Sequence, residues 1–304
     1  MKHHGDLLVV VLTLALAGCA SPTNPAPTAP PTAVPTAAPS LVPGDAWLRR
    51  DLGAGEAVVW YLGHCGYAIR TQSHLLIFDY QEQYDGPQPK LRPAQPALAN
   101  GFIVPAEIAD QRVRVFVTHS HNDHFSRVIF QWKDKIPDIA YYFGWKAASD
   151  PSYHYLVGPR AQLQSGDLEV YTVNSHHSGV PEVAYLVKVD GLVIYHNGDY
   201  QREYETDYPY LRELTARIDL TFAIRGFEDG TRYLMQNTDL FERFEHGAIF
   251  PTHDSAEKGQ YAEFEKVFLA KFPVLPLFIP WRVGERFLFR DGQITREGGE
   301  TGVG

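Results

Sequence analysis

Apolar and polar residues are arranged along the chain in a pattern that predicts strands in its first half and a mixture of strands and helices in its second. The stretch VVWYLGHCGYAIRTQSHLLIFDY, which begins at Val58, contains three short β-rich runs separated by turn residues, and it predicts a meander of antiparallel strands. Residues 81–107 are rich in Pro, Gln and Gly and predict a long loop, which in a compact domain is usually functional. Arg112–Val117 is an apolar strand, and apolar residues at helical spacing after it predict a helix that ends near Lys135.

The second half begins with further β-rich runs, of which the last two are joined by Asp190-Gly191, a strong hairpin signal. The predicted strands of this part are Ile139–Phe143, Leu168–Val173, Ala184–Val189 and Leu192–Tyr195. Helices predicted at Tyr208–Thr215, Thr238–His246 and Glu257–Lys271 then alternate with strands at Leu220–Ile224, Ala248–Pro251 and Val283–Arg290. Two successive halves, each with strands before helices, predict an α/β fold of the αββα type, in which two mixed β-sheets lie face to face and helices flank them.

The N-terminus has the pattern of an export signal. A Lys and two His residues precede an apolar run from Leu7 to Ala17, which is too short to span a bilayer and suits the apolar region of a signal peptide. The run ends in Leu16-Ala17-Gly18-Cys19, which resembles the lipobox of bacterial lipoproteins. That resemblance implies removal of residues 1–18 and lipidation of Cys19, with the protein anchored to a bacterial membrane and facing the periplasm or the cell exterior. A plain secretory signal or an anchor helix is the alternative.

Residues 19–44 are almost wholly Pro, Thr, Ala and Ser, a composition that cannot bury apolar area. Because prolines keep such a segment extended, it predicts a disordered tether between the membrane and the folded part. The folded domain is predicted at residues 45–292, and the Gly-rich residues 293–304 are expected to form a flexible tail.

Composition limits the partners. A hydrophobic content of 44% is that of a globular protein, and the formal net charge of −9 disfavours nucleic acid as a partner because like charges repel. The chain has two cysteines, Cys19 and Cys65. If Cys19 is lipidated, Cys65 has no partner within the chain, so a disulfide framework is excluded.

The most informative segment is Thr118-His119-Ser120-His121-Asn122-Asp123-His124, which follows the predicted strand Arg112–Val117 directly. Imidazole and carboxylate side chains are the ligands that suit zinc. The strand end fixes the first two His side chains, and the following turn presents Asp123 and His124 on the opposite side. One short segment can therefore serve two metal ions.

This segment matches the H-x-H-x-D-H signature of the metallo-β-lactamase superfamily, and the sequence is similar to that family across nearly all of residues 56–290. Its opening strands resemble those of the lactonase-like and phosphodiesterase-like branches. In the family a third His ligand ends a later strand, a bridging Asp follows a hairpin, and a last His follows a short apolar strand. The matching segments here are Asn174-Ser175-His176-His177-Ser178-Gly179, Ile194-Tyr195-His196-Asn197-Gly198-Asp199 and Ile249-Phe250-Pro251-Thr252-His253.

The resemblance implies two divalent metal ions, with zinc favoured and manganese or iron as alternatives. The first would be bound by His119, His121 and His177, the second by Asp123, His124 and His253, and Asp199 would bridge both. His176 is the alternative to His177, which is preferred because Ser178-Gly179 follows it. His64 and His196 are assigned to supporting positions because the matching family positions are not ligands.

Two metals of this kind hold a bridging water and lower its pKa toward ~7, which supplies a hydroxide nucleophile at neutral pH. Asp123 is the predicted catalytic residue, because it would orient that nucleophile while binding metal. Cys65 is then expected to be a buried small residue and not a catalytic thiol. Candidate substrate contacts are Arg225, Tyr80 and Tyr200, each of which follows a predicted strand end.

The predicted function is hydrolysis of a phosphodiester, lactone or related ester, that is, of a small-molecule substrate. An iron-dependent oxidase of the same fold is one alternative. Some branches of the superfamily place Glu at the second position of the motif and bind iron, whereas His121 stands there in this chain. The other alternative is a non-catalytic, metal-binding surface lipoprotein, although every position matched to a ligand is filled.

Overall fold

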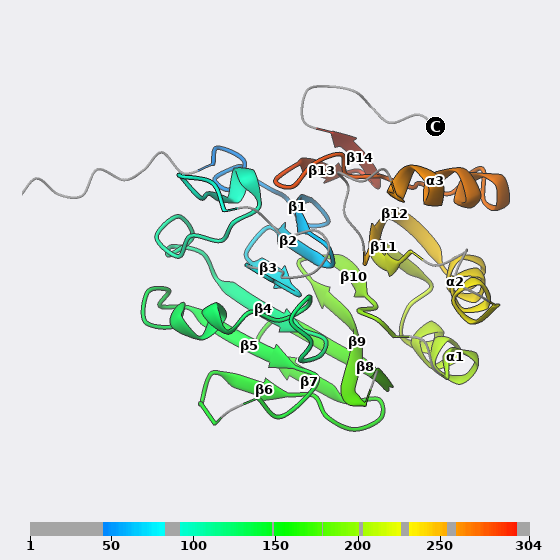
Figure 1. Ribbon diagram of the computed structural model, residues 1–304, viewed down its shortest axis with the longest axis horizontal. Helices are drawn as coiled ribbons and strands as arrows, with labels where there is room; N and C mark the ends of the chain where they lie inside the picture. Colours follow the sequence, from blue (N-terminus) through cyan, green and yellow to red (C-terminus); the bar gives the residue numbers. More distant parts are fainter. Residues whose placement is uncertain are drawn as a thin grey trace, which may run out of the picture. The chain divides into compact units, whose positions relative to one another are not determined.

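The computed structural model describes residues 45–82, 92–147, 149–177, 179–200, 203–225, 231–253 and 260–296; for 174–177, 231–233 and 260 it describes the backbone alone. The predicted signal peptide, Cys19 and the tether lie outside these residues. Among the described helices, none has both the length and the apolar character needed to cross a membrane. The described residues form two β-sheets with helices beside them (Figure 1).

The first sheet has the strand order β14-β13-β1-β2-β3-β4-β5-β6. Strands β1, β2 and β3 form the predicted antiparallel meander, and β3, β4, β5 and β6 run parallel. The carboxyl ends of β3 and β4 therefore lie at the same edge of the sheet. The strands are β1 Ala57–Gly63, β2 Gly66–Arg70, β3 Leu75–Phe78, β4 Val113–Val117, β5 Ile139–Phe143, β6 Tyr153–Tyr155, β13 Arg286–Arg290 and β14 Gln293–Arg296.

The second sheet has the order β12-β11-β10-β9-β8-β7. Its first three strands in that order are parallel, and the remaining pairs are antiparallel. The predicted Asp190-Gly191 hairpin joins β9 to β10. The strands are β7 Gln162–Ser165, β8 Leu168–His177, β9 Val180–Val189, β10 Leu192–His196, β11 Arg217–Ile224 and β12 Glu245–Thr252.

Both faces of the first sheet are buried, and strand β1 shows how. Val59 and Tyr61 pack into the core between the two sheets, whereas Val58 and Trp60 pack into a second core on the outer face. Because successive side chains of a strand point to opposite faces, a strand covered on both sides reads as an uninterrupted apolar run. That is why the opening strands have so few polar residues.

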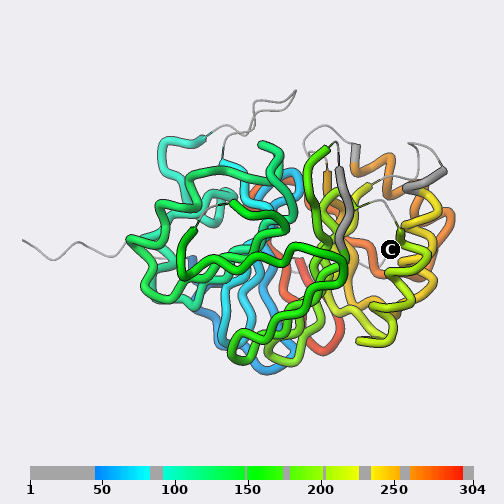
Figure 2. The backbone as a smooth tube through the Cα atoms, turned by 90° about the horizontal axis from the view of Figure 1, so that it is seen from below, coloured from blue at the N-terminus to red at the C-terminus, as the bar shows by residue number. Residues whose placement is uncertain are grey.

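Helices α1 (Tyr204–Leu214), α2 (Thr231–Arg243) and α3 (Gln260–Lys271) gather beside the second sheet (Figures 1 and 2). Their apolar residues, for example Tyr208, Phe241 and Phe264, belong to the same core cluster as the strands of the second sheet. Over the outer face of the first sheet, the described chain has 3-10 helices and turns, whereas one helix, ending near Lys135, is predicted there. The 3-10 helices are η1 Leu98–Asn100 and η2 Arg127–Gln131.

The helix predicted to end near Lys135 is replaced by η2. Its backbone bonds span three residues, as in Ile129 N to Ser126 O at 3.2 Å, so this segment winds more tightly than an α-helix. Ile129, Trp132 and Ile136 are nevertheless buried at the predicted spacing. The apolar pattern therefore located the covering segment correctly but not its helix type.

Other differences concern boundaries. Gln293–Arg296, predicted as the start of a flexible tail, forms strand β14 because Ile294 packs into the core and pairs with Phe289. Helix α1 begins at Tyr204, four residues before the predicted start, and Pro209 lies inside it. Proline favours the first turn of a helix, which explains the late predicted start. The short strands β6 and β7 were not predicted.

Candidate metal centre

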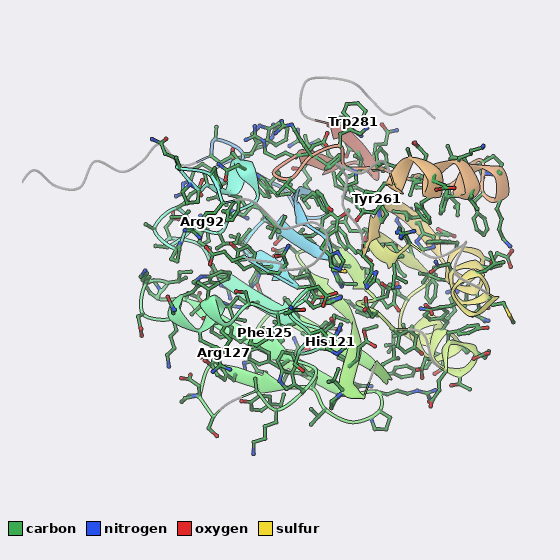
Figure 3. All side chains as sticks on the ribbon, viewed as in Figure 1. Arg92, His121, Phe125, Arg127, Tyr261 and Trp281 are labelled. Atoms are coloured by element: carbon green, nitrogen blue, oxygen red, sulfur yellow. The ribbon has the colours of Figure 1, made fainter. Side chains whose placement is uncertain are left out.

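The His-rich segment begins where strand β4 ends and continues as a turn. The backbone N–H groups of His124 and Phe125 both donate to the carbonyl oxygen of His121, at 3.1 and 2.9 Å. Figure 3 labels His121 and Phe125, which this turn carries. The turn reverses the chain within a few residues, so that several polar side chains gather at the carboxyl ends of β3 and β4.

Thr118, the residue before the first His, is tightly enclosed. Its backbone N–H and its hydroxyl donate to the two carboxylate oxygens of Asp79, each at 2.8 Å. A Cβ atom at Gly144 would lie 2.3 Å from the Thr118 carbonyl oxygen, and one at Gly198 would lie 2.7 Å from its hydroxyl oxygen. Only bare backbone fits at these two positions, and this close packing fixes the start of the His-rich segment.

The first set of candidate ligands is His119, His121 and Asp123, whose donor atoms all lie within 4.8 Å of one another. His119 Nε2 and His121 Nδ1 are 3.0 Å apart. His119 is fully buried, whereas His121 and Asp123 are half-buried. This set therefore opens toward solvent on the side of the turn.

The second set is Asp123, His124 and His253, together with His64, again within 4.8 Å of one another. Asp199 lies beside it. Its Oδ1 is 3.3 Å from His124 Nε2, and its Oδ2 is 3.2 Å from His253 Nε2. Since Asp123 belongs to both sets, one carboxylate lies between the two positions.

These distances fit metal coordination. Zinc binds nitrogen and oxygen at about 2.0–2.1 Å, and tetrahedral geometry then separates two of its ligands by roughly 3.3 Å. The two Asp199 contacts and the contact between His119 and His121 agree with that separation to within a few tenths of an ångström. Imidazole nitrogen and carboxylate oxygen also form the donor set that zinc prefers.

Asp79 orients one of the candidate ligands. Its Oδ2 accepts a hydrogen bond from His124 Nδ1 at 2.8 Å, so the proton of that imidazole is held away from the site. The remaining lone pair, on Nε2, points toward Asp199 and Asp123. A carboxylate behind a histidine ligand commonly has this role, because it fixes both the tautomer and the ring orientation. Asp79 has a φ of 42°, an unusual conformation for a residue with a side chain.

Glu182 supports the first set in a similar way. It is buried, its Oε1 lies 3.6 Å from His119 Nδ1, and the same oxygen accepts the backbone N–H of Asp199 at 2.6 Å. A single carboxylate on strand β9 therefore contacts both His119 and the loop that carries Asp199.

The electrostatics of the centre favour a bound cation. Burial raises the pKa of Asp199, but His124 and His253 outweigh it and hold the pKa well below its usual range. Conversely, burial lowers the pKa of His253, but the Asp199 carboxylate outweighs it and raises the value. Burial also lowers the pKa of His119 to about 3, so that imidazole is neutral. Ionised carboxylates and neutral imidazoles are the forms that bind metal, so a metal ion would have to displace the proton that Asp199 stabilises on His253.

The structure thus brings together His119, His121, Asp123, His124, Asp199 and His253, and their role as metal ligands stays a prediction. His177 closes strand β8, and its backbone pairs with Val180. The side chains of His176 and His177 lie outside the described residues, so the third ligand of the first set stays a prediction.

The three candidate substrate contacts lie in different surroundings. Tyr80 is 1% exposed, and its hydroxyl accepts the backbone N–H of Ile103 at 3.1 Å. Tyr200 is fully buried, and its hydroxyl donates to Asp207 at 2.6 Å. Both hydroxyls therefore hold neighbouring segments in place from within the core. Arg225 is half-buried next to the end of β12, and its backbone N–H donates to Thr252 O at 3.1 Å.

Cys65 and His196 lie behind the centre. Cys65 is fully buried, 3.8 Å from His124 Nε2, and burial raises the pKa of its thiol to about 12. His196 is also buried, and its Nε2 donates to the Cys65 carbonyl oxygen at 2.8 Å. These surroundings agree with the structural roles expected for both residues.

Two residues of the centre, Asp79 and Glu182, were not predicted as members of it, and His64 was predicted only in a supporting position. The sequence contained an indication for Glu182, because a charged residue near the start of the apolar strand β9 requires a partner. The sequence indications for Asp79 and His64 were weaker. Asp79 follows an apolar strand like many surface residues, and His64 lies in a short turn between two strands.

Comparison with solved structures shows the fold. A metallo hydrolase from the hyperthermophilic archaeon Ignicoccus hospitalis is similar over 77% of this chain and 99% of its own, with a TM-score of 0.55 and 13% identity. A metallo-beta-lactamase fold protein from Bacillus subtilis is similar over the same shares, with a TM-score of 0.53 and 14% identity. The described domain therefore has the metallo-β-lactamase fold, as predicted.

A diiron beta-hydroxylase from Streptomyces venezuelae also shares the fold. The similarity covers 77% of this chain and 54% of that protein, with a TM-score of 0.50 and 11% identity. No family model matches the sequence, and no curated protein matches it. The similarity is thus one of structure, and the candidate ligands have to be judged by their geometry in this chain.

Proposed function

We propose that this chain is a metal-dependent hydrolase that cleaves a phosphodiester, a lactone or a related ester. The observation that carries this proposal is the position of Asp123, which belongs to both sets of candidate ligands. A carboxylate shared between two adjacent positions is expected of a two-metal site, and such sites are used to hydrolyse esters and phosphoesters.

The residues suited to the first metal are His119 and His121, with His177 as the predicted third ligand. Those suited to the second are Asp123, His124 and His253, with Asp199 between the two. When bound, the metals would supply an activated water at neutral pH and would polarise the oxygen of the scissile group. Zinc suits this donor set best, and manganese or iron are the alternatives.

Asp123 is the residue proposed to assist proton transfer from the attacking water. Its side chain is 19% exposed, whereas those of His124 and Asp199 are almost wholly buried. It therefore borders the side from which water and substrate enter. Its carboxylate accepts a hydrogen bond from the attacking water and aligns it. As the new bond forms and the ester bond breaks, a proton from the water passes to the leaving oxygen.

The proposed substrate is a small molecule. The similarity of the opening strands to lactonase-like and phosphodiesterase-like enzymes supports this range of substrates. Arg225 is the candidate contact for an anionic group, because it follows β11 and is bonded to the end of β12, just before His253. The net charge of −9 makes nucleic acid an unfavourable partner.

An iron-dependent oxidase is the second candidate, because the fold is shared with a diiron beta-hydroxylase. Metal analysis separates the two candidates. A hydrolase is expected to be active with zinc and to need no reductant, whereas an oxidase is expected to depend on iron and oxygen.

The test of the proposal combines metal content with a substrate screen. The full chain, purified in detergent, is expected to bind about two divalent ions and to hydrolyse bis-p-nitrophenyl phosphate or a lactone in preference to nitrocefin. Asp123→Asn is expected to lose this activity, and Asp134→Asn, at an exposed position eleven residues after Asp123, serves as the matched control. A metal-loaded chain inactive on all three substrate classes would contradict the proposal.

We also propose that the domain is displayed on a membrane through lipidated Cys19. The lipobox-like sequence supports this assignment. In the native host, Cys19→Ser is expected to move the protein from the detergent phase to the aqueous phase, or to leave an uncleaved precursor. Unchanged partitioning of mature Cys19→Ser protein would rule out the lipid anchor.

A further inference from the structure

The turn between β1 and β2 contains a histidine where the backbone favours a smaller residue. Gly63 pairs with Gly66, which leaves His64 and Cys65 at the centre of the turn. The φ angles of Gly63 and His64 are 100° and 51°, so both residues have left-handed backbone. Glycine and asparagine adopt such angles with the least strain. The backbone alone therefore does not account for a histidine at position 64, and the contacts of its imidazole indicate its role.

The imidazole of His64 contacts the second set of candidate ligands. Its Nε2 lies 3.3 Å from Asp123 Oδ2. Its ring centroid lies 4.8 Å from that of His253 and 5.7 Å from that of His124. The donor atoms of all four residues lie within 4.8 Å of one another. Two ligands of one tetrahedral zinc ion are separated by roughly 3.3 Å, which is the distance between His64 and Asp123.

The second sheet and its helices hold this turn in place. His196, at the end of β10, donates to the Cys65 carbonyl oxygen at 2.8 Å. Tyr261, on α3, donates to the His64 carbonyl oxygen at 3.4 Å. Both bonds go to the backbone of the turn. The side chain is 13% exposed, so its position is set by the backbone and by the neighbouring histidines.

We propose that His64 is a further ligand of the second metal position, which it binds through Nε2 in addition to Asp123, His124, His253 and the shared Asp199. This inference rests on the metal centre of the proposed function. It makes the turn between β1 and β2 part of that centre, although the sequence had assigned His64 to a supporting position. Three imidazoles at one position also favour zinc over magnesium or calcium, which prefer oxygen ligands.

The test uses His64→Asn, because asparagine keeps the left-handed turn while removing the imidazole. The matched control is His154→Asn, which removes a half-buried imidazole that stacks on Tyr142 in the first sheet. The full chain is loaded with Co²⁺, and exchangeable imidazole N–H protons shifted by the paramagnetic ion are counted by proton NMR. His64→Asn is expected to lose one such resonance and to bind the second Co²⁺ about 10–100-fold more weakly. His154→Asn is expected to retain both properties.

A full set of shifted resonances in His64→Asn would overturn the proposal, even if turnover falls, because His64 would then orient Asp123 without binding metal. His64→Gly, which also suits the left-handed turn, replaces the asparagine variant if the latter fails to fold. The wild-type titration distinguishes this outcome from failure of the proposed function. If the wild-type chain binds no second Co²⁺, the two-metal proposal fails before the variants are compared.

Discussion

Two clusters of histidine and aspartate lie at opposite ends of strand β3, and their chemistry differs. His74 immediately precedes the strand, and Asp79 of the metal centre immediately follows it. The cluster at the first end consists of His74, Asp167 and Asp190, whose donor atoms lie within 4.8 Å of one another, as they do in the metal centre. By distance alone, either end of the strand would hold a cation.

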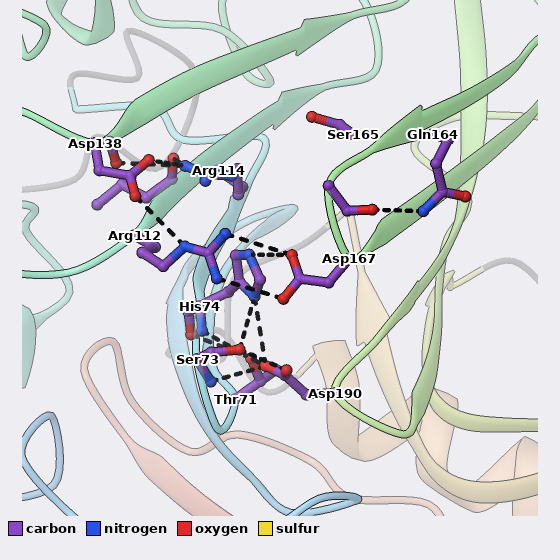
Figure 4. A network of polar contacts seen from close by, with 12 residues as sticks. Thr71, Ser73, His74, Arg112, Arg114, Asp138, Gln164, Ser165, Asp167 and Asp190 are labelled. Atoms are coloured by element: carbon purple, nitrogen blue, oxygen red, sulfur yellow. Dashed lines mark hydrogen bonds and ion pairs between the residues drawn. The ribbon is translucent and has the colours of Figure 1, made fainter.

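The His74 cluster already contains its own hydrogen-bond donors and positive charge (Figure 4). Asp190 accepts bonds from the Thr71 hydroxyl at 2.6 Å and from the Ser73 backbone N–H at 2.8 Å. Arg112 contacts both carboxylate oxygens of Asp167, each at 3.4 Å. Within the chain, Arg112 therefore neutralises Asp167 and hydrogen bonds satisfy Asp190, and the cluster ties together the ends of several strands.

In the metal centre the described ion-pair contacts of Asp123 and Asp199 are with imidazoles. The Asp199 carboxylate raises the pKa of His253, so an exchangeable proton on the imidazole compensates the carboxylate charge, and a metal ion from solution can replace that proton. The comparison shows that close donor atoms do not define a metal site by themselves. The source of the compensating charge decides between a structural cluster and a functional one.

The largest expected effect is that of Asp123→Asn at the metal centre. The substitution keeps the size and one oxygen donor but removes the charge that aligns the nucleophile, which commonly costs about 10²–10³ in rate. We expect turnover to fall by that factor while the fold and at least one metal are retained. Turnover numbers at confirmed metal occupancy check this. Full activity would place the chemistry elsewhere.

The next effect concerns the doublet at the end of β8. If His177 is the third ligand of the first position, His177→Ala should lower bound metal from about two ions to one per chain. His176→Ala should leave it near two. Metal analysis after gel filtration decides between them, and the reverse pattern would transfer the assignment to His176.

A smaller effect, of a different kind, is expected at the other end of β3. Asp190→Asn weakens buried hydrogen bonds to a charged group, which contribute about 1.5–3 kcal/mol. We expect the free energy of unfolding to fall by that order, measured by denaturant titration, with metal content and turnover unchanged. Loss of a metal ion from this variant would show that the His74 cluster is a metal site after all.

The smallest effect is in the pH dependence of stability. Burial lowers the pKa of His74, although Asp167 and Asp190 partly oppose this, so the folded chain keeps the imidazole neutral. The unfolded chain binds a proton near pH 6.5, and unfolding is therefore favoured as the pH falls below that value. His74→Gln should show a shallower loss of stability between pH 7.5 and 5. Parallel curves for the variant and the wild type would contradict this.

The sequence predicted the metal centre where its residues are close together in the chain. The run from His119 to His124 follows one strand, so strand and motif could be recognised together. Asp79 was missed because it bonds to Thr118 and His124, which are 39 and 45 positions away. His64 was assigned only to a supporting position, because its contact with Asp123, which is 59 positions away, exists only once β1 and β4 are strands of the same sheet.

The sequence predicted the two sheets of the fold but not the 3-10 helices or the last strand. Long apolar runs identified the two sheets, because burial on both faces leaves a strong pattern. The layer over the first sheet was not predicted as 3-10 helix, since Ile129 and Trp132 have the same spacing in either helix type. The strand at Gln293–Arg296 carries a single buried residue, Ile294, and such a short signal cannot be told from a loop.

The crowding around Thr118 bears on how this metal centre can be transferred or lost. The backbone of Gly144 and Gly198 approaches Thr118 too closely for any side chain. A designer who copies the seven-residue motif into another sheet must therefore copy two distant glycines with it. By the same reasoning, a descendant of this protein could keep every ligand and still lose the centre through one alanine at Gly144. The metal centre therefore depends on Gly144 and Gly198 as well as on its ligands.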